Sequence, residues 1–286
     1  MTISGSAKLA GVMGWPVGQS LSPALHGYWL AEHGIDGAYV PLAVRPEDFA
    51  TVLEGLKRAG FRGVNVTLPH KQAAFALAAR HDPASAATGA VNLLVFGDAG
   101  IEGRNTDTAG IGAALAGALG PDGMKNRAAV IWGAGGAARA AVYTLSGMGA
   151  GEIHILNRTR ARAEALAAAL QPLGAVRLIA GGFEDWKPAA AGAALLANTT
   201  SAGMKQAPSI DLPLEALPAE AAVMDVVYNP LETGLLARAR QLGRRTIDGL
   251  EMLMHQAVPA FAAFYGATPR VTPGLRAALE KALGNG

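Results

Sequence analysis

The sequence contains no cysteine, which excludes disulfide bonds, a thiolate nucleophile and a zinc ion held by cysteine. Charged residues are also sparse, at 16% of the chain, and 24 basic against 22 acidic residues leave a net charge of +2. This balance lacks the basic excess that marks nucleic-acid-binding proteins, so no nucleic-acid partner is expected.

Long apolar runs are missing as well. The stretch 8–19 is briefly apolar, but it is short, rich in glycine and interrupted by Pro16, which suits neither a cleaved signal peptide nor a membrane span. The chain also shows no internal repeat of fixed period and no low-complexity segment. We therefore expect a cytoplasmic protein without a membrane partner.

The 286 residues, 51% of them hydrophobic, exceed the usual size of a single core, so we expect two domains with a cleft between them. The first part of the chain alternates short β-like runs with helical patterns, which predicts a mainly parallel sheet covered by helices. Strands are expected at 9–14, 38–44 and 63–67, and helices at 23–33, 46–59 and 69–79.

The second part begins with a helix that follows Asn105-Thr106-Asp107 and ends near Leu119, where Gly-Pro-Asp-Gly at 120–123 stops it. Strand patterns then alternate with alanine-rich helices, as in a doubly wound nucleotide-binding domain. Two last helices are expected to pack on the first domain. The sequence therefore predicts one domain of residues 1–107 completed by 249–286, and a second of 108–248. The strands expected in the second domain are 128–132, 153–156, 194–198 and 222–227.

A glycine-rich turn directly follows the strand at 128–132. Residues Gly133-Ala134-Gly135-Gly136-Ala137-Ala138 match the dinucleotide-binding pattern, with alanine in the last position. Glycine is needed there because a side chain would keep backbone N–H groups away from the pyrophosphate, which the helix N-terminus also attracts. A glycine-rich turn without a ligand is the alternative, but the strand before it and the helix after it favour dinucleotide binding.

Arginines follow the next strand of this domain. About 20 residues beyond the glycine turn, NAD-selective folds place an acid that binds the ribose 2′-hydroxyl. Here the strand ends in Asn157-Arg158-Thr159-Arg160, with Arg162 close behind. Guanidinium groups pair with a 2′-phosphate that an acid would repel, so the sequence predicts NADP. A solvated position at a helix start is the alternative interpretation for at least one of these arginines.

Polar residues also gather in two other segments, Asn65-Val66-Thr67-Leu68-Pro69-His70-Lys71 after a predicted strand and Asn105-Thr106-Asp107 at a predicted helix start. Hydride removal from a secondary alcohol needs a group that takes the hydroxyl proton, and a lysine with a carboxylate can do this. Open α/β sheets bind ligands at such strand ends. Taken singly, these residues are ordinary turn, cap and surface residues.

Further short motifs extend along nearly the whole chain: Gly14-Trp15-Pro16, Ser20–His26, Ala90-Val91-Asn92, Asn198-Thr199-Thr200, Asp225–Pro230 and Gly249–Gln256. With the motifs above, they resemble the shikimate dehydrogenase family in order and spacing. The resemblance implies a two-lobed α/β protein, with an N-terminal α/β sandwich on a mainly parallel sheet and a doubly wound Rossmann domain that binds NADP. The implied activity is the reversible reduction of 3-dehydroshikimate to shikimate with NADPH, in aromatic amino acid biosynthesis.

The resemblance also implies roles for individual residues. Lys71 and Asp107 would form the catalytic pair at the hydroxyl that is oxidised, and either could be the base. Other residues would bind the substrate carboxylate or ring hydroxyls. A residue satisfied in the core is the alternative for Gln256 and, more strongly, for Tyr228. The implied substrate residues are Ser20, Ser22, Thr67, Lys71, Asn92, Asp107, Tyr228 and Gln256. The implied cofactor residues are Gly133, Ala134, Gly135, Gly136, Ala137, Asn157, Arg158, Thr159, Arg162, Thr199, Val226 and Gly249.

Three positions depart from the family pattern. Gln19 stands where histidine is usual, Leu93 replaces the usual threonine, and Phe264-Tyr265-Gly266 replaces an ending with tryptophan. Leu93 removes a hydroxyl near the expected ligand contacts, which leaves open a quinate dehydrogenase with relaxed substrate or cofactor choice.

A non-catalytic NADP-binding sensor is a hypothesis from another class, and it is disfavoured because such a protein gains little from keeping both Lys71 and Asp107. His26, His70 and His255 lack metal-ligand spacing, so no metal is expected and these histidines are interpreted as structural or as supporting the site. The motifs do not predict the oligomeric state. A homodimer is one candidate.

Overall fold

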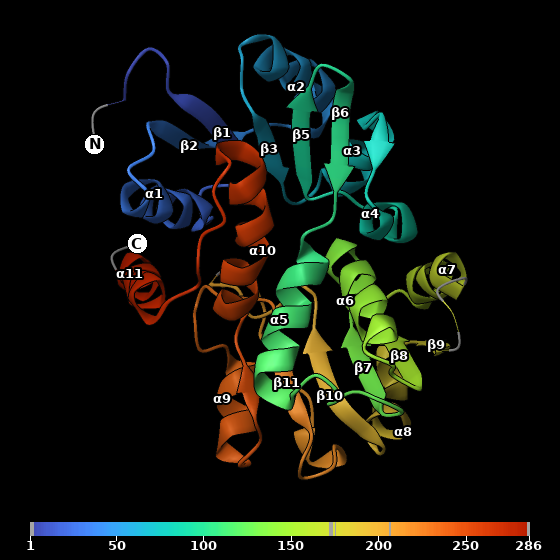
Figure 1. The fold of residues 1–286 in the computed structure, drawn as a ribbon. Coiled ribbons are helices and arrows are strands. Elements are labelled where there is room, and N and C mark those ends of the chain that lie inside the picture. The colour runs from blue at the N-terminus through green and yellow to red at the C-terminus, as the bar shows by residue number, and fades with distance from the viewer. Residues whose placement is uncertain (1–2, 172–173, 175, 206, 285–286) are drawn as a thin grey trace. The chain divides into compact units, whose positions relative to one another are not determined.

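The computed structural model describes residues 3–171, 174, 176–205 and 207–284 (Figure 1). The chain forms two compact units: unit 1 comprises Met1–Thr106 and Leu253–Gly286, and unit 2 comprises Asp107–Met252. The domain ranges expected from the sequence also contain residues 1–2, 172–173, 175, 206 and 285–286, which lie outside the described residues. No described helix combines the length and the apolar character of a membrane span.

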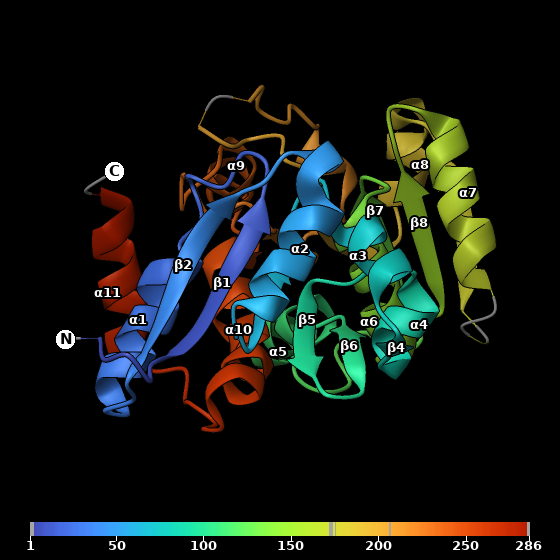
Figure 2. The same cartoon turned by 90° about the horizontal axis from the view of Figure 1, so that it is seen from above.

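Unit 1 is built on a six-stranded sheet with the order β2-β1-β3-β5-β6-β4. β1 pairs in parallel with β2 and β3, whereas β5 is antiparallel to both β3 and β6. Figure 2 shows β1 and β2 side by side, as this pairing requires. The strands are β1 (Lys8–Gly14), β2 (Gly37–Ala43), β3 (Gly63–Val66), β4 (Arg80–His81), β5 (Leu93–Gly97) and β6 (Gly100–Arg104).

The two faces of this sheet carry different side chains because successive residues of a strand point to opposite faces. One face is apolar, where Val64 and Leu94 pack with Phe49 of α2. The other face carries Tyr39 and Asn65, and α1 and α10 contribute aromatic rings beside Tyr39. The helices are α1 (Ser22–Glu32), η1 (Pro46–Asp48), α2 (Phe49–Arg58), α3 (Lys71–Leu77), α4 (Pro83–Thr88), α10 (Gly249–Tyr265) and α11 (Pro273–Gly284).

Unit 2 has a six-stranded, fully parallel sheet with the order β12-β11-β10-β7-β8-β9. The chain steps outward from β7 to β9, returns to β10 beside β7, and then steps outward in the other direction, which is the doubly wound arrangement. The strands are β7 (Ala128–Trp132), β8 (Glu152–Leu156), β9 (Arg177–Gly181), β10 (Ala193–Asn198), β11 (Ala222–Asp225) and β12 (Thr246–Ile247). With the mixed sheet of unit 1, this topology confirms the predicted α/β class.

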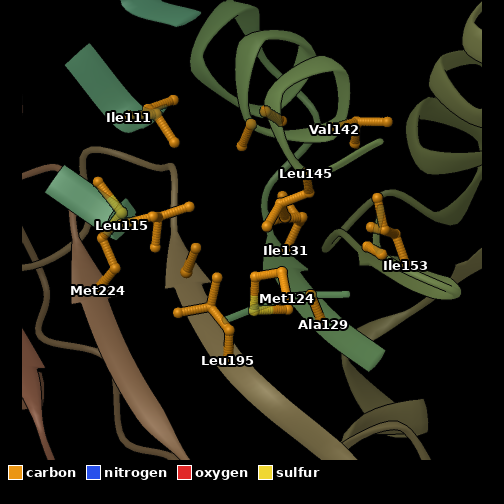
Figure 3. Packing of buried hydrophobic residues seen from close by; sticks show 14 of the residues in the cluster. Ile111, Leu115, Met124, Ala129, Ile131, Val142, Leu145, Ile153, Leu195 and Met224 are labelled. Atoms are coloured by element: carbon orange, nitrogen blue, oxygen red, sulfur yellow. The ribbon is translucent and has the colours of Figure 1, made fainter. Parts of the chain in front are cut away.

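Helices cover the sheet of unit 2 and bury its apolar side chains. Figure 3 shows Ile111 and Leu115 of α5 and Leu145 of α6 above Ile131 of β7 and Leu195 of β10. Burial of each Leu or Ile side chain contributes about 1.5–3 kcal/mol to the stability of the fold. This layer therefore fixes the strands whose ends carry the polar residues. The helices are α5 (Asp107–Leu119), α6 (Gly136–Gly147), α7 (Arg160–Leu170), η3 (Phe183–Asp185), α8 (Trp186–Ala190), η4 (Leu214–Ala216) and α9 (Gly234–Gln241).

Candidate active site

The carboxyl ends of β1 and β3 position the first predicted substrate residues. The two strands are parallel neighbours, with Met13 paired to Val66, so the chain leaves both at the same edge of the sheet. The backbone N–H of Thr67 donates to the carbonyl of Met13 at 2.9 Å. Ser20 lies between β1 and α1, and the N–H of Ser22, the first residue of α1, donates to the Ser20 hydroxyl at 3.3 Å. Thr67 therefore lies at the sheet edge from which the chain leaves β1 toward Ser20 and Ser22.

Lys71 is the first residue of α3 and is half-buried. Its carbonyl accepts a hydrogen bond from the N–H of Val91 at 3.0 Å, which ties the start of the helix to the residue before Asn92. His70 is structural, since its Nε2 lies 2.8 Å from the carbonyl oxygen of Val44 and its ring stacks on Phe49. Among the described residues, no group of three or more histidine or acidic side chains is arranged to hold a metal ion.

A buried hydrogen-bond network joins two predicted substrate residues, Asn92 and Gln256. Asn92 Nδ2 donates to Thr106 Oγ1 at 3.0 Å and lies 3.4 Å from Gln256 Oε1. The N–H of Thr106 donates to Asn92 Oδ1 at 2.7 Å, and its hydroxyl lies 3.3 Å from Gln256 Oε1. Three segments far apart in the sequence therefore converge in unit 1. Thr106 was given no role from the sequence, although its motif had been singled out.

Asp107 is buried and begins α5. Asp107 directly follows Thr106, so the hydrogen bonds that hold Thr106 also fix the backbone position of Asp107. Lys71 belongs to unit 1 and Asp107 to unit 2, and their convergence on one alcohol stays a prediction. Tyr228 follows β11 in unit 2 and is half-buried.

The glycine turn lies between β7 and α6, beside the end of β10. Gly133 has a φ of 117°, and a Cβ there would lie 2.7 Å from Thr200 Cγ2 and 2.9 Å from Thr199 Oγ1. Only glycine fits this position. The N-cap of α6 is Gly135, which has no side chain to cap the helix. The N–H groups of the first turn therefore keep their capacity to bind an anion. β7 and β10 are the strands where the chain order reverses, which is where doubly wound sheets bind nucleotides.

Gly249 contacts the backbone of Val226. A Cβ on Gly249 would lie 2.3 Å from the Val226 carbonyl oxygen and 2.7 Å from that of Val227. The N–H of Val226 in turn donates to the carbonyl of Asn198 at 3.1 Å, one residue before Thr199. The structure thus brings together three predicted cofactor residues, Thr199, Val226 and Gly249, at the ends of β10 and β11.

The arginine turn after β8 contains three arginines in different environments. Arg160 donates to Glu184 at 2.9 Å and to Asp185 at 2.5 Å. The hydrogen bond to Glu184 is the main cause that raises the pKa of the Arg160 guanidinium, with Asp185 next. Arg158 and Arg162 have exposed side chains, and the Asn157 amide donates to the carbonyl of Thr159 at 2.9 Å. Arg160 therefore already has two acidic partners within unit 2.

Asp225, at the end of β11, was given no role from the sequence. Its carboxylate is fully buried and accepts hydrogen bonds from Asn198 Nδ2 at 2.8 Å, the Val227 N–H at 3.0 Å and the Thr233 hydroxyl at 2.7 Å. Burial raises the pKa of this carboxyl, although the three donors oppose that effect. Its place in the Asp225–Pro230 motif was the only signal.

Two family models match the chain. One, described as the substrate binding domain of shikimate dehydrogenase, matches residues 12–94, and the other, described as shikimate / quinate 5-dehydrogenase, matches residues 115–203. A shikimate dehydrogenase (NADP(+)) of Paramagnetospirillum magneticum is 50% identical over 279 residues, which are 96% of this chain and 99% of the relative. That of Methylobacterium radiotolerans is 51% identical over 269 residues, or 93% and 94% of the two chains.

Solved structures are similar over the same length. A shikimate dehydrogenase in complex with NADP+ has a TM-score of 0.87 and 33% identity, covering 99% of this chain and 97% of the other. The enzyme of Thermus thermophilus in complex with NADP(H) and shikimate has a TM-score of 0.82 and 35% identity, covering 97% and 99%. These matches span both units.

Proposed function

Because the chain belongs to the shikimate dehydrogenase family, we propose that it is the NADP-dependent oxidoreductase that reversibly reduces 3-dehydroshikimate to shikimate. One observation carries this conclusion: about half of the residues are identical to those of NADP-dependent shikimate dehydrogenases over nearly the full length of both chains. The reaction places the enzyme in aromatic amino acid biosynthesis.

The chemistry requires a hydride and a proton. Bound NADPH supplies the hydride to the carbonyl carbon, and the carbonyl oxygen becomes an alkoxide that must be protonated. The Lys71 ammonium stabilises this developing charge, and Lys71 or Asp107 delivers the proton. In the direction of oxidation, the same pair takes the hydroxyl proton. The role requires that both side chains reach one alcohol oxygen.

Substrate recognition is assigned to residues around this pair. Ser20 and Ser22 bind the carboxylate of the acid through their hydroxyls. Thr67, Asn92, Tyr228 and Gln256 contact the carboxylate or the ring hydroxyls. The hydrogen bonds among Asn92, Thr106 and Gln256 support this assignment, because they preset the two amides before a ligand arrives.

The cofactor is assigned to unit 2. The turn of Gly133, Ala134, Gly135, Gly136 and Ala137 receives the pyrophosphate, and the close approach of Gly133 to Thr199 supports this fit, since a side chain would fill the turn. Arg158 and Arg162 pair with the 2′-phosphate beside Asn157 and Thr159. Thr199, Val226 and Gly249 are also assigned to the cofactor, because they lie together at the ends of β10 and β11.

On this proposal, residues 1–107 with 249–286 form the substrate domain, and residues 108–248 form the NADP domain. We place the enzyme in the cytoplasm and take a homodimer as the assembly to test. Sedimentation velocity across a concentration range would separate a dimer from a monomer.

A kinetic panel tests the proposed function. Purified protein should turn over shikimate with NADP at a higher kcat/KM than any other pair drawn from shikimate, quinate, NADP and NAD. Leu93, the departure that raised the quinate alternative, is fully buried in β5, and the panel tests whether it changes the choice between shikimate and quinate. A folded protein that reduces no NADP with shikimate would defeat the proposal, and a higher kcat/KM for quinate or NAD would replace it with the broader activity.

A further inference from the structure

We infer that Tyr39 is a positioning residue for the substrate site: its hydroxyl fixes the orientation of Asn65, and Asn65 in turn holds Asn92. The inference deepens the proposed function and rests on it, because Asn92 is assigned there to the substrate. Tyr39 lies in the middle of β2 and belongs to none of the motifs that pointed to the site.

The strand register brings Tyr39 and Asn65 together. Tyr39 pairs with Ala10 of β1, and Asn65 pairs with Val12 of the same strand. Ala10 and Val12 point to the same face because side chains alternate along a strand, so Tyr39 and Asn65 share that face across β1. The Tyr39 hydroxyl lies 2.8 Å from Asn65 Oδ1, and Asn65 Nδ2 lies 3.1 Å from the carbonyl oxygen of Asn92.

The chemistry of these contacts permits one arrangement of protons. The Asn92 carbonyl can only accept, so the amide nitrogen of Asn65 must face it and the amide oxygen must face Tyr39. The Tyr39 hydroxyl is then the donor. Without that donor, Asn65 would keep a buried oxygen unpaired or turn its amide, which would set two oxygens against each other at Asn92.

Asn92 is held from two sides. Its carbonyl accepts from Asn65 Nδ2 and also from the N–H of Val66 at 2.8 Å, which uses both lone pairs. Its side-chain amide exchanges hydrogen bonds with Thr106 and faces Gln256. Loss of the Tyr39 hydroxyl therefore acts first on Asn65, then on the backbone carbonyl of Asn92, and through that backbone on the Asn92 side chain.

Aromatic rings fix the position of the Tyr39 ring. The imidazole of His26 stacks on it with 3.9 Å between ring centroids and 7° between planes, and Phe264 lies 6.3 Å away. Because His26 is fully buried, the stack adds no net charge at neutral pH. Packing thus holds the Tyr39 ring in place, and the Tyr39 hydroxyl donates the hydrogen bond that orients the Asn65 amide.

Tyr39→Phe removes this one hydroxyl, and Tyr265→Phe is the matched control. Tyr265 lies in the same aromatic cluster, is also buried, and donates its hydroxyl to the carbonyl of Ala38 at 2.9 Å. Both variants lose a buried hydroxyl that donates a hydrogen bond. Only Tyr39 is connected to Asn92.

The readout is steady-state kinetics with shikimate and NADP, together with the melting temperature of each variant. Tyr39→Phe should lower kcat/KM for shikimate by roughly 5- to 150-fold, the range expected when a buried polar group loses its partner, and should leave KM for NADP within twofold. Tyr265→Phe should change neither constant by more than twofold. Tyr39→Phe combined with Asn65→Ala should be no slower than Asn65→Ala alone, because the hydroxyl acts through that amide.

Two outcomes overturn the inference while the proposed function stands: kinetics of Tyr39→Phe equal to those of Tyr265→Phe, or effects of the two substitutions at 39 and 65 that simply add. A wild-type protein that does not oxidise shikimate overturns the proposed function and, with it, a positioning role toward this substrate.

Discussion

His26 is a histidine whose surroundings determine its charge. Its side chain is fully buried beside the rings of Trp29, Tyr39 and Phe261, and among the described residues neither ring nitrogen has a hydrogen-bond partner. Burial lowers the pKa of the imidazole from 6.5 to about 3, because a protonated ring would be an unpaired charge in an apolar cluster. His26 is therefore neutral at physiological pH.

This shift predicts a pH dependence of stability. Between pH 6.5 and about 3 the unfolded chain protonates His26 while the folded chain does not, so folding stability falls as the pH falls through this window. The contribution of His26 is on the order of 2 kcal/mol between pH 6.5 and 5. His26→Phe keeps a stacking ring without a proton site, so urea unfolding of this variant should lose less stability across that range than the wild type. His33→Gln, at an exposed position, should follow the wild type, and parallel curves for all three proteins would contradict the assignment.

The arginine turn allows a test of cofactor choice. Arg158→Ala should raise KM for NADP roughly tenfold or more, since a charge-assisted pair with the 2′-phosphate is lost, and should leave KM for shikimate nearly unchanged. Arg160→Ala is the matched control because Arg160 is already paired with Glu184 and Asp185, and it should change KM for NADP by less than twofold. A larger effect of Arg160 than of Arg158 would reverse the two roles.

Asp225, at the element scale, links its own strand β11 to strand β10 and to helix α9. It lies at the end of β11 and accepts from Asn198 at the end of β10 and from Thr233, the N-cap of α9. The loops after β10 and β11 carry Thr199, Val226 and Tyr228. One buried carboxylate thus ties together the segments that carry predicted cofactor and substrate contacts.

Asp225→Ala should lower the free energy of unfolding by about 1–3 kcal/mol, because its donors are left unpaired, and should raise KM for NADP. Asp225→Asn should restore most of the affinity, since its oxygen can still accept from Asn198 and Val227 and its amide can donate to Thr233. Leu166→Ala, in the core of α7, is the control that destabilises unit 2 without touching these loops. Equal KM values for Asp225→Ala and Leu166→Ala would reduce Asp225 to a purely structural role.

Elements with a strong local pattern were predicted well from the sequence. The strand expected at 128–132 is β7 to the residue, and the helix expected to end at Leu119 is α5. The elements missed are short or depend on distant partners. β4 has two residues and exists through its pairing with β6, and β12 has two residues paired with β11. Their pairing partners, rather than local propensity, form them.

The hairpin of β5 and β6 was a different kind of omission. Its signal is present in the sequence, since Leu-Leu-Val-Phe at 93–96 is followed by Gly-Asp-Ala-Gly at 97–100, which is typical of a strand and a tight turn. This hairpin makes part of the first sheet antiparallel. It also brings Asn92 beside Thr106, because Leu93 pairs with Arg104.

At the scale of the whole molecule, the order of motifs predicted the family and the α/β class, because each motif is a local string of residues. The network around Asn92 could not be predicted in the same way. Asn65, Thr106 and Gln256 contact Asn92 from three separate segments, and Tyr39 reaches it through Asn65. This arrangement depends on strand register and on the return of the chain after residue 252. A residue whose role depends on contacts with several helices and strands can therefore be assigned that role only once the three-dimensional structure is known.

Lys71→Ala separates an enzyme from an NADP-binding sensor. Lys71 lies in unit 1, whereas all the predicted cofactor residues lie in unit 2, so the substitution should leave the Kd for NADP, measured by fluorescence titration, within twofold. If Lys71 stabilises the alkoxide or carries the proton, kcat should fall by roughly 10²–10⁴-fold. Lys281→Ala, an exposed lysine of α11, should retain wild-type kcat. Intact turnover of Lys71→Ala with weakened ligand binding would remove the residue from the chemistry, because a proton carrier cannot be lost without slowing the step that moves the proton.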